Sequence, residues 1–149
     1  MNAKCRMTTI IATIKPQHLA NIREGCKLEE VRKSIPKAQL PIRVLCCESG
    51  SGGAIKCEFI LDKYREETVE SIHRKYLSCM ARWTIIPKAR ISLGELEAYI
   101  GTDPSRKIYF WHISRMVDYC STSGYRVRHI SEFGLQRAPQ SWCYAKAAV

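Results

Sequence analysis

The segment GCKLEEVRKSIPK, residues 25–37, constrains the fold most, because it places a sharp turn before a short, heavily charged strand. Gly25 can end a helix and allow a tight turn. Side chains alternate between the two faces of a strand, so Glu30 and Arg32 should share one face, with Lys27 where the strand begins. A carboxylate held beside cations on a sheet face is a candidate anion site. A solvated edge strand with ordinary surface charge pairs would show the same pattern and is the alternative interpretation.

The rest of the chain alternates strand-like and helix-like patterns. Strands are predicted over residues 8–14, 28–33, 42–47, 54–61 and 106–117, with a short edge strand over 125–127 and a turn at 131–134. Helices are predicted over residues 17–24 after Pro16, over 66–80, and from Ser92 to Gly101, where Ser92 and Glu95 have the spacing of a capping box. Five or six strands with two or three flanking helices predict a small α+β barrel. We expect one domain over residues 1–149, with residues 1–7 disordered.

The charge of the chain is strongly basic and unevenly distributed. The formal net charge is +10, from 24 Lys and Arg against 14 Asp and Glu. Residues 1–50 carry nine basic and four acidic side chains, and residues 101–149 carry seven and three, whereas residues 51–100 are nearly balanced at eight and seven. If the fold brings the two basic thirds together, their surface attracts polyanions, nucleic acid first. A basic protein with no such partner is the alternative.

Cysteine and histidine positions argue against a metal site. The eight cysteines include no Cys-x-x-Cys pair, and the four histidines have no ligand spacing. Neighbouring Cys46 and Cys47 should point to opposite faces of a strand. We therefore interpret most of the cysteines as small buried apolar side chains in a reducing cytoplasm, and we expect no metal and no cofactor. No apolar run approaches about 18 residues, so no membrane span is expected, and the early apolar run is too short for a signal peptide.

The charged segment also carries a family resemblance. Gly25-x-Lys27-x-x-Glu30-x-Arg32 resembles the signature of the ASCH domain, a member of the PUA-like superfamily. Three further stretches resemble bacterial and phage members of that family: IKP at residues 14–16, RKSIPK at 32–37 and LQRAPQSWCY at 135–144. The resemblance implies a β-barrel with a cleft beside the signature strand, and it implies RNA binding.

The same resemblance raises the question of catalysis. Some relatives are implicated in RNA cleavage, and one small branch hydrolyses the acetyl amide of 4-acetylcytidine with a Thr, a Lys and a Glu. Lys27 matches that branch, but Glu30 stands where the branch has its Thr nucleophile. A carboxylate cannot substitute for that hydroxyl, so we predict no efficient deacetylation. We expect Glu30 instead to hold Lys27 as a charged ammonium, and we expect any RNA cleavage to be independent of metal.

The candidate site residues follow from these motifs. Lys27, Glu30 and Arg32 are the catalytic candidates if the protein is an enzyme. The candidate nucleic-acid contacts are Lys15, Lys27, Arg32, Lys33, Lys37, Arg137, Gln140, Ser141, Trp142 and Tyr144. Trp142 and Tyr144 lie two positions apart, so an extended chain puts both rings on one face. There they could stack on bases or close the barrel, and we expect at least one of them in the core.

Three classes of function are compatible with this sequence. The first is an RNA-binding module with a basic cleft, whose partner is single-stranded RNA and which acts in RNA metabolism or regulation. The second is a metal-independent ribonuclease or a modified-nucleoside hydrolase. The third is a phage-type protein–protein adaptor or inhibitor, which would be marked by an exposed apolar patch.

Overall fold

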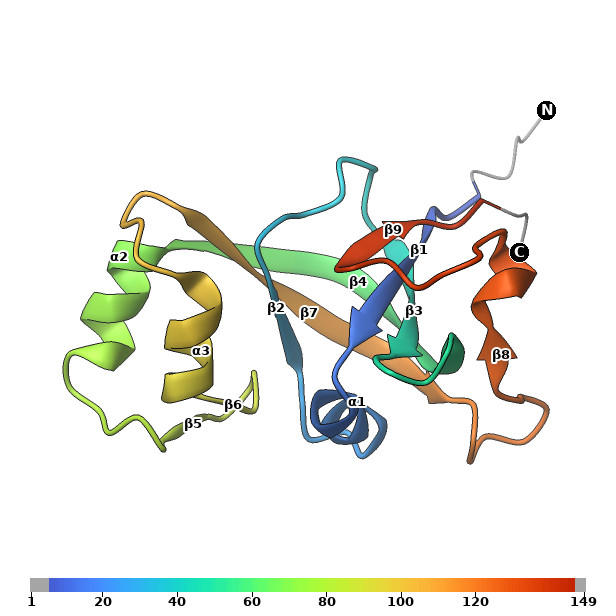
Figure 1. The fold of residues 1–149 in the computed structure, drawn as a ribbon, viewed down its shortest axis with the longest axis horizontal. Helices are drawn as coiled ribbons and strands as arrows, with labels where there is room; N and C mark the ends of the chain where they lie inside the picture. The colour runs from blue at the N-terminus through green and yellow to red at the C-terminus, as the bar shows by residue number, and fades with distance from the viewer. Residues whose placement is uncertain (1–5, 147–149) are drawn as a thin grey trace.

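A curled seven-stranded sheet forms the body of the fold in the computed structural model, which describes residues 6–146 (Figure 1). Six of its strands follow the order β2-β7-β4-β3-β1-β9, and β8 pairs with β4. The strands are β1 (Thr9–Ile14), β2 (Glu29–Arg32), β3 (Ile42–Glu48), β4 (Ala54–Thr68), β7 (Lys107–Asp118), β8 (Arg128–His129) and β9 (Trp142–Tyr144). β1 and β3 are parallel, and the remaining pairs are antiparallel. The predicted α+β architecture, a curled sheet with flanking helices, is thereby confirmed.

The centre of the sheet is apolar on both faces. Ile10, Ile11 and Ala12 of β1 are fully buried, and so are Val44 to Cys47 of β3, as expected for β-branched and small side chains in interior strands. One face packs against helix α1 (Pro16–Arg23), and the other packs against the short 3-10 helix η2 (Ile130–Phe133). The last strand, β9, pairs with β1, so the two basic thirds of the chain meet in the sheet.

Helix α1 leads the chain from β1 to the charged strand. Pro16 occupies the first helical turn, where its missing N–H costs nothing. Leu19 and Ile22 are buried against the sheet. The helix ends before Gly25, whose φ of +78° is the left-handed conformation that glycine adopts most readily. The turn that the sequence predicted therefore sets the direction in which β2 begins.

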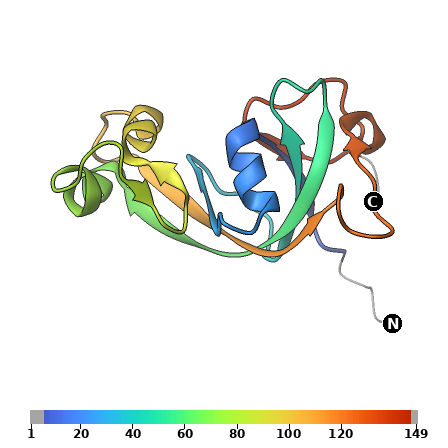
Figure 2. The ribbon, with the colours of Figure 1, turned by 90° about the horizontal axis from the view of Figure 1, so that it is seen from below.

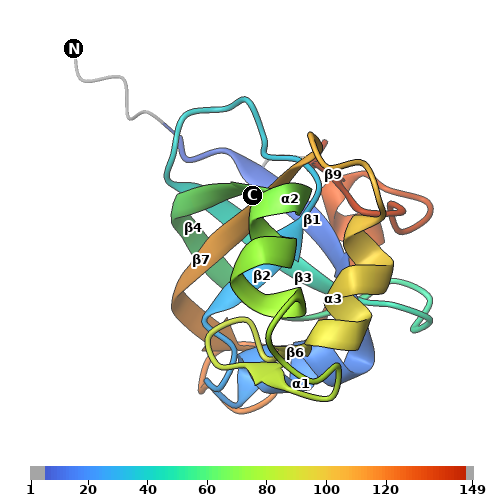
Figure 3. The same cartoon turned by 90° about the vertical axis from the view of Figure 1, so that its left-hand side faces the viewer.

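A helical lobe, residues 69–106, extends from one end of the sheet (Figure 1). It sits on the long antiparallel pair of β4 and β7, which continues beyond the barrel as a two-stranded ribbon (Figure 2). The lobe contains α2 (Val69–Ile72), the π-helix η1 (His73–Leu77), the short hairpin of β5 (Ile85–Ile86) and β6 (Ile91–Ser92), and α3 (Leu93–Ile100). Seen from the lobe, α2 and α3 lie side by side (Figure 3). They share a core with Val31 and Phe110 of the sheet.

Three predicted elements differ from the structure in their extent or type. The helix expected over residues 66–80 is limited to residues 69–77, because β4 continues to Thr68. Its residues 64–68 keep their backbone paired with β7, and the Arg65 side chain donates hydrogen bonds to Glu29 on β2. Thr68 then caps α2 by accepting a hydrogen bond from the backbone N–H of Ser71. The edge strand expected over 125–127 forms at Arg128–His129 instead, and the predicted turn at 131–134 is mostly the 3-10 helix.

The cysteine interpretation is only partly right. Of the seven described cysteines, Cys46, Cys47 and Cys57 are buried, Cys143 is half-buried, and three are exposed at positions 26, 79 and 120. Cys46 and Cys47 do face opposite cores. In the part of the chain that the structure describes, no cysteine forms a disulfide. The disorder predicted for residues 1–7 is not tested at residues 1–5, which lie outside the described residues. No helix within residues 6–146 is long and apolar enough to cross a membrane.

Candidate functional site

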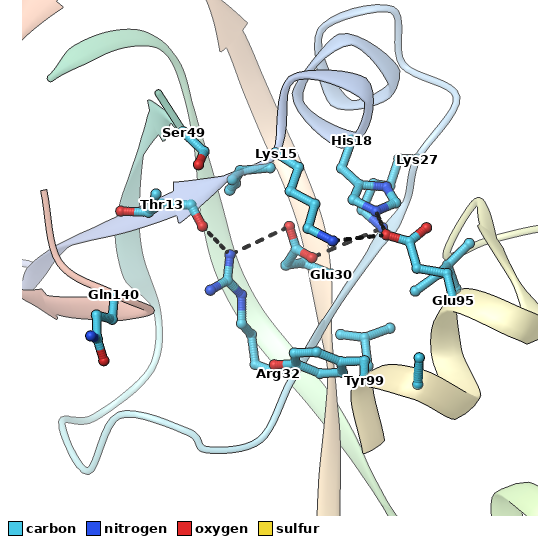
Figure 4. A pocket seen from close by; sticks show the side chains of 14 residues that line it. Thr13, Lys15, His18, Lys27, Glu30, Arg32, Ser49, Glu95, Tyr99 and Gln140 are labelled. Carbon is cyan, nitrogen blue, oxygen red and sulfur yellow. Dashed lines mark hydrogen bonds and ion pairs between the residues drawn. The ribbon is translucent and has the colours of Figure 1, made fainter. Parts of the chain in front are cut away.

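A pocket of about 410 Å³ lies between β1, α1, β2 and α3 (Figure 4). Most of the side chains that line it are polar or charged. They are Thr13, Lys15, His18, Lys27, Glu30, Arg32, Ser49, Glu95, Tyr99 and Gln140, with Ile14, Val31, Ile91 and Ala98 as the apolar part of the wall. The charged strand therefore faces the pocket, and the sequence alternative of a solvated edge strand is wrong.

Glu30 and Arg32 enter the pocket from one face of β2, as their spacing predicted. All four residues of β2 are buried, because the strand lies between β7 and the lobe. Lys27 precedes the strand and is almost fully buried, with 2% of its surface exposed. Its Nζ donates a hydrogen bond to the carbonyl oxygen of Ala89 and lies 4.0 Å from Glu30 Oε1. The three candidate catalytic residues thus form one cluster.

The buried position of Lys27 lowers its pKa. Burial penalises the charged ammonium most, and the nearby carboxylate of Glu30 opposes that effect without cancelling it. Glu30 therefore acts in the direction that the sequence predicted, but the net shift is opposite to the expected one. A lysine of this kind releases its proton more readily than a surface lysine does, which is the property required of a proton carrier or an amine nucleophile.

Arg32 is fixed to the backbone of the two strands that close the sheet. Its Nη2 donates to Thr13 O at 2.8 Å, and its Nη1 donates to Ser141 O at 3.3 Å and Ser141 Oγ at 3.2 Å. The guanidinium also lies over the Trp111 ring, 5.9 Å from its centroid. These contacts explain why β9 must pair with β1 for the site to form.

The pocket contains buried polar atoms that no described residue satisfies. Arg32 Nη2 lies 3.9 Å from Glu30 Oε2, which is too long for a hydrogen bond. Glu30 Oε2, Arg32 Nε and His18 Nδ1 have no hydrogen-bond partner among the described residues. Buried polar atoms without partners are uncommon in folded proteins and call for an explanation. Two buried polar atoms on β2 and one on α1 thus lie beside the pocket without a hydrogen-bond partner among the described residues.

A second charged group lines the opposite wall. His18 Nε2 lies 2.7 Å from Glu95 Oε1, and Lys15 Nζ lies 3.5 Å from the same oxygen. Burial opposes ionisation of Glu95, but the hydrogen bond and charge of His18, together with Lys15, outweigh it and lower the pKa of this carboxyl. Glu95 is therefore a carboxylate that holds a histidine and a lysine beside the pocket.

Sequence reasoning missed His18 and Glu95. Glu95 was assigned to a capping box, but only half of that box forms. Ser92 Oγ accepts from the backbone N–H of Glu95 at 3.1 Å, while the Glu95 side chain points to His18. The available signal was the spacing of Lys15 and His18, since residues three apart at a helix start lie on the same side.

The remaining predicted residues lie at varying distances from the pocket. Gln140 lines it and Ser141 bonds Arg32. Lys33 is exposed, with its Nζ 4.7 Å from the centroid of the Tyr99 ring in the pocket wall. Lys37 and Arg137 are exposed and do not line the pocket.

The two aromatic residues of β9 have different environments. Trp142 packs against the core beside Trp111, and its Nε1 donates to Ser34 Oγ at 2.9 Å. Tyr144 is 43% exposed, with its ring edge-on to Trp142. Trp142 thus packs against the core but stays partly buried, so the prediction of one ring in the core holds only in part. Within residues 6–146 no three His, Cys, Asp or Glu side chains are grouped as a metal site would require.

Solved structures with a similar fold show which kind of architecture this is. The α+β fold, a curled sheet with flanking helices, is similar to that of the ASCH protein of Zymomonas mobilis. The crystal structure of that protein aligns with a TM-score of 0.63 over 92% of this chain and 87% of the other, at 15% sequence identity. Structures of two single-residue variants of the same protein align equally well, one of them over 89% of its chain. No protein-family model and no curated protein matches the sequence. The chain therefore has an ASCH fold, as the sequence resemblance predicted.

Proposed function

We propose that this protein binds single-stranded RNA, with one nucleotide in the pocket between β1, α1, β2 and α3, and that it acts in RNA metabolism or regulation. The observation that carries the proposal is the buried cluster of Lys27, Glu30 and Arg32, in which Glu30 Oε2 and Arg32 Nε have no partner among the described residues. A volume of about 410 Å³ suits a nucleotide-sized ligand.

The cluster divides into a part that suits a base and a part that suits phosphate. A carboxylate with a free oxygen accepts a hydrogen bond from an amino or imino group on a base edge, and such edges are accessible in single-stranded RNA. Arg32 is buried and most of its donors are occupied by Thr13 and Ser141, so it is less suited to phosphate than an exposed lysine. The exposed ammonium groups of Lys15 and Lys33 at the pocket edge are better placed for phosphate.

The charge of the whole chain supports a polyanionic partner. Pairing of β1 with β9 joins the two basic thirds of a chain whose net charge is +10. Each phosphate contact on a single strand should contribute about −0.7 to the slope of log K against log salt. Binding should therefore weaken steeply as salt is raised.

The proposal is tested by the anisotropy of a labelled single-stranded RNA over a salt titration. The variants are Lys15→Ala, which removes one phosphate contact, and Lys27→Met, which removes the buried amine. Lys56→Ala is the matched control, since Lys56 lies on β4 in a surface pair with Glu48. We expect Lys15→Ala to reduce the salt slope by about 0.7 and Lys27→Met to weaken binding, with the control unchanged. Salt-independent binding, or wild-type affinity in both variants, would overturn the proposal.

Metal-independent cleavage of RNA is the second candidate function, and the partnerless carboxylate oxygen of Glu30 favours it. Cleavage requires a base for the 2′-hydroxyl and cations for the charge that develops on phosphorus. Glu30 with its free oxygen could act as the base, and Lys15 or Lys27 as the cation. We still expect no efficient deacetylation of 4-acetylcytidine, because Glu30 replaces the nucleophilic hydroxyl.

Assays of labelled RNA and of 4-acetylcytidine, each with and without a chelator, separate these activities. Cleavage that survives the chelator and is lost in Glu30→Gln would support the second candidate. Rapid deacetylation abolished by Lys27→Ala would contradict our assignment of Glu30. Cleavage lost only in the chelator would mean that a metal takes part.

A further inference from the structure

The segment from His73 to Ser92 in the helical lobe has an unusual charge composition. Its twenty residues contain no Asp or Glu and five basic residues, which are Arg74, Lys75, Arg82, Lys88 and Arg90. Lys75 pairs with Glu67, and Arg82 pairs with Glu97 at 3.4 Å. No ion pair within the described chain involves Arg74, Lys88 or Arg90. The segment therefore presents a net positive surface although the middle third of the chain is nearly neutral.

The same segment exposes a large aromatic ring. Trp83 is 81% exposed, whereas Trp111 is fully buried and Trp142 is partly buried. Met80 and Ile85, on either side of Trp83 in sequence, are also largely exposed. Exposed apolar groups clustered in this way mark interaction sites. An indole beside basic side chains is suited to stacking on a nucleic-acid base while the cations contact phosphate.

Part of this segment is attached directly to the pocket. The carbonyl oxygen of Lys88 accepts hydrogen bonds from the backbone N–H groups of Leu28 and Glu29, at 2.7 and 3.0 Å. The carbonyl oxygen of Ala89 accepts from Lys27, and Ile91 lines the pocket. The end of the basic segment, residues 88–91, therefore adjoins the strand that carries Glu30 and forms part of the pocket wall.

Arg90 has a backbone conformation that disfavours an arginine. Its φ of +50° is in the left-handed region, where glycine would avoid the strain. The turn is fixed by a hydrogen bond from Arg90 N to Ile86 O at 2.7 Å. The arginine side chain is therefore present at a position where it costs stability, which is typical of a functional role.

We propose that residues 82–90 form a second RNA contact, which binds nucleotides that flank the one in the pocket. Trp83 stacks on a base, and Arg82, Lys88 and Arg90 contact phosphates. This inference rests on the proposed function, since it names where the rest of the RNA strand lies. The occupant is a polyanion with flat rings, and it matches both the absence of acidic residues from positions 73–92 and the exposed indole.

The test compares a nucleoside monophosphate, which fits the pocket alone, with a single-stranded RNA of about twelve nucleotides. Trp83→Ala should weaken binding of the longer RNA about five- to hundredfold and leave the monophosphate unaffected. Trp83→Phe should restore most of the affinity, because a phenyl ring still stacks. Arg90→Gly should weaken binding of the longer RNA without lowering thermal stability, because glycine suits this φ. Tyr125→Ala, which removes an exposed ring from the loop before β8 at the other end of the molecule, is the control (Figure 1).

Tryptophan fluorescence gives an independent readout. The longer RNA should quench the emission of exposed Trp83, and the monophosphate should not. If the wild type binds the longer RNA and both Trp83→Ala and Arg90→Gly bind it equally well, this inference is wrong while the proposed function stands. If the wild type binds neither RNA ligand, the proposed function fails first. Trp83-dependent binding of anionic lipid vesicles or of an acidic peptide, without RNA binding, would also overturn the inference.

Discussion

Two clusters on the sheet each place a glutamate beside an arginine, but they differ in how many hydrogen bonds the carboxylate accepts. On β3 and β4, Arg43 donates to both oxygens of Glu58 at 2.9 and 3.0 Å, and the Tyr119 hydroxyl donates to the same carboxylate at 2.8 Å. In the pocket, Glu30 lies 3.9 Å from Arg32 and 4.0 Å from Lys27, and its Oε2 has no partner among the described residues. Both glutamate residues are buried, with 6% of Glu30 and 9% of Glu58 exposed.

The difference follows from where the partners lie in the sheet. Arg43 and Glu58 come from facing strands in close register, so the guanidinium meets the carboxylate in a parallel, two-bond geometry. Glu30 and Arg32 lie two apart on one strand, with side chains side by side, and Arg32 reaches away to Thr13 O. A complete pair stabilises the fold, whereas an incomplete one leaves a carboxylate that can bind a ligand.

The largest expected effect is on stability. Glu58→Gln replaces a charged acceptor of three hydrogen bonds in a mostly buried site, and it should lower the free energy of unfolding by about 2–4 kcal/mol. Glu30→Gln removes a buried charge without a hydrogen bond, and it should change that free energy by less than about 1 kcal/mol. Urea unfolding of both variants and the wild type, at neutral pH, measures the two values. Equal destabilisation by the two variants would mean that Glu30 is as structural as Glu58.

The next largest effect is on RNA affinity, where Glu30→Gln should have a larger effect than Glu58→Gln, the reverse of their effects on stability. Glu30→Gln should weaken binding of single-stranded RNA about tenfold, because a charged acceptor in the pocket contributes about 1.5–3 kcal/mol to a hydrogen bond with a base. Glu58→Gln should bind with wild-type affinity at a temperature where it is folded. Anisotropy titrations under identical salt provide the comparison. If only Glu58→Gln binds more weakly, RNA binds on the side of the sheet that carries Arg43, and our assignment of the pocket is wrong.

This contrast also shows what the sequence could and could not predict. Gly25 and the alternation of charges on residues 27–32 were sufficient to place Lys27, Glu30 and Arg32 together, because period-two alternation and a glycine turn are local properties. The strand order, the parallel pairing of β1 with β3 and the assignment of β9 to the β1 edge depend on contacts between distant residues, and the sequence indicated them only through the family resemblance.

The wrong sequence predictions also result from contacts between residues that are distant in the sequence. Residues 66–68 were predicted to begin a helix, but the long pairing of β4 with β7 keeps them extended. Glu95 satisfies a local capping pattern, yet its side chain is directed by His18, 77 positions away in the sequence. The pKa of Lys27 depends on burial by Ala89 and the lobe, which spacing along β2 does not specify.

The smallest expected effect is a pH dependence that arises from Lys27. Its pKa in the folded protein is lowered below the ordinary value of 10.5, mainly by burial. Between the lowered pKa and pH 10.5 the unfolded chain binds more protons than the folded chain, so stability rises with pH in that window. The difference in unfolding free energy, wild type minus Lys27→Met, should therefore rise as pH increases toward 10.5 and be flat at lower pH. Urea unfolding of both proteins at several pH values measures this difference. The contributions of groups that titrate equally in both proteins cancel.

Glu30→Gln sharpens this last prediction and ties it to the comparison of the two clusters. The carboxylate of Glu30 raises the pKa of Lys27 against the effect of burial, so its removal should lower that pKa further. When both proteins also carry Glu30→Gln, the difference in unfolding free energy between the protein with Lys27 and the protein with Lys27→Met should begin to rise at a lower pH. Removing the carboxylate of the other cluster, with Glu58→Gln, should not change the pH at which the difference begins to rise. Glu58 is not among the main charges that shift the pKa of Lys27. An onset that shifts equally in both backgrounds would mean that the pH dependence reports a general loss of packing instead of the charge on Lys27.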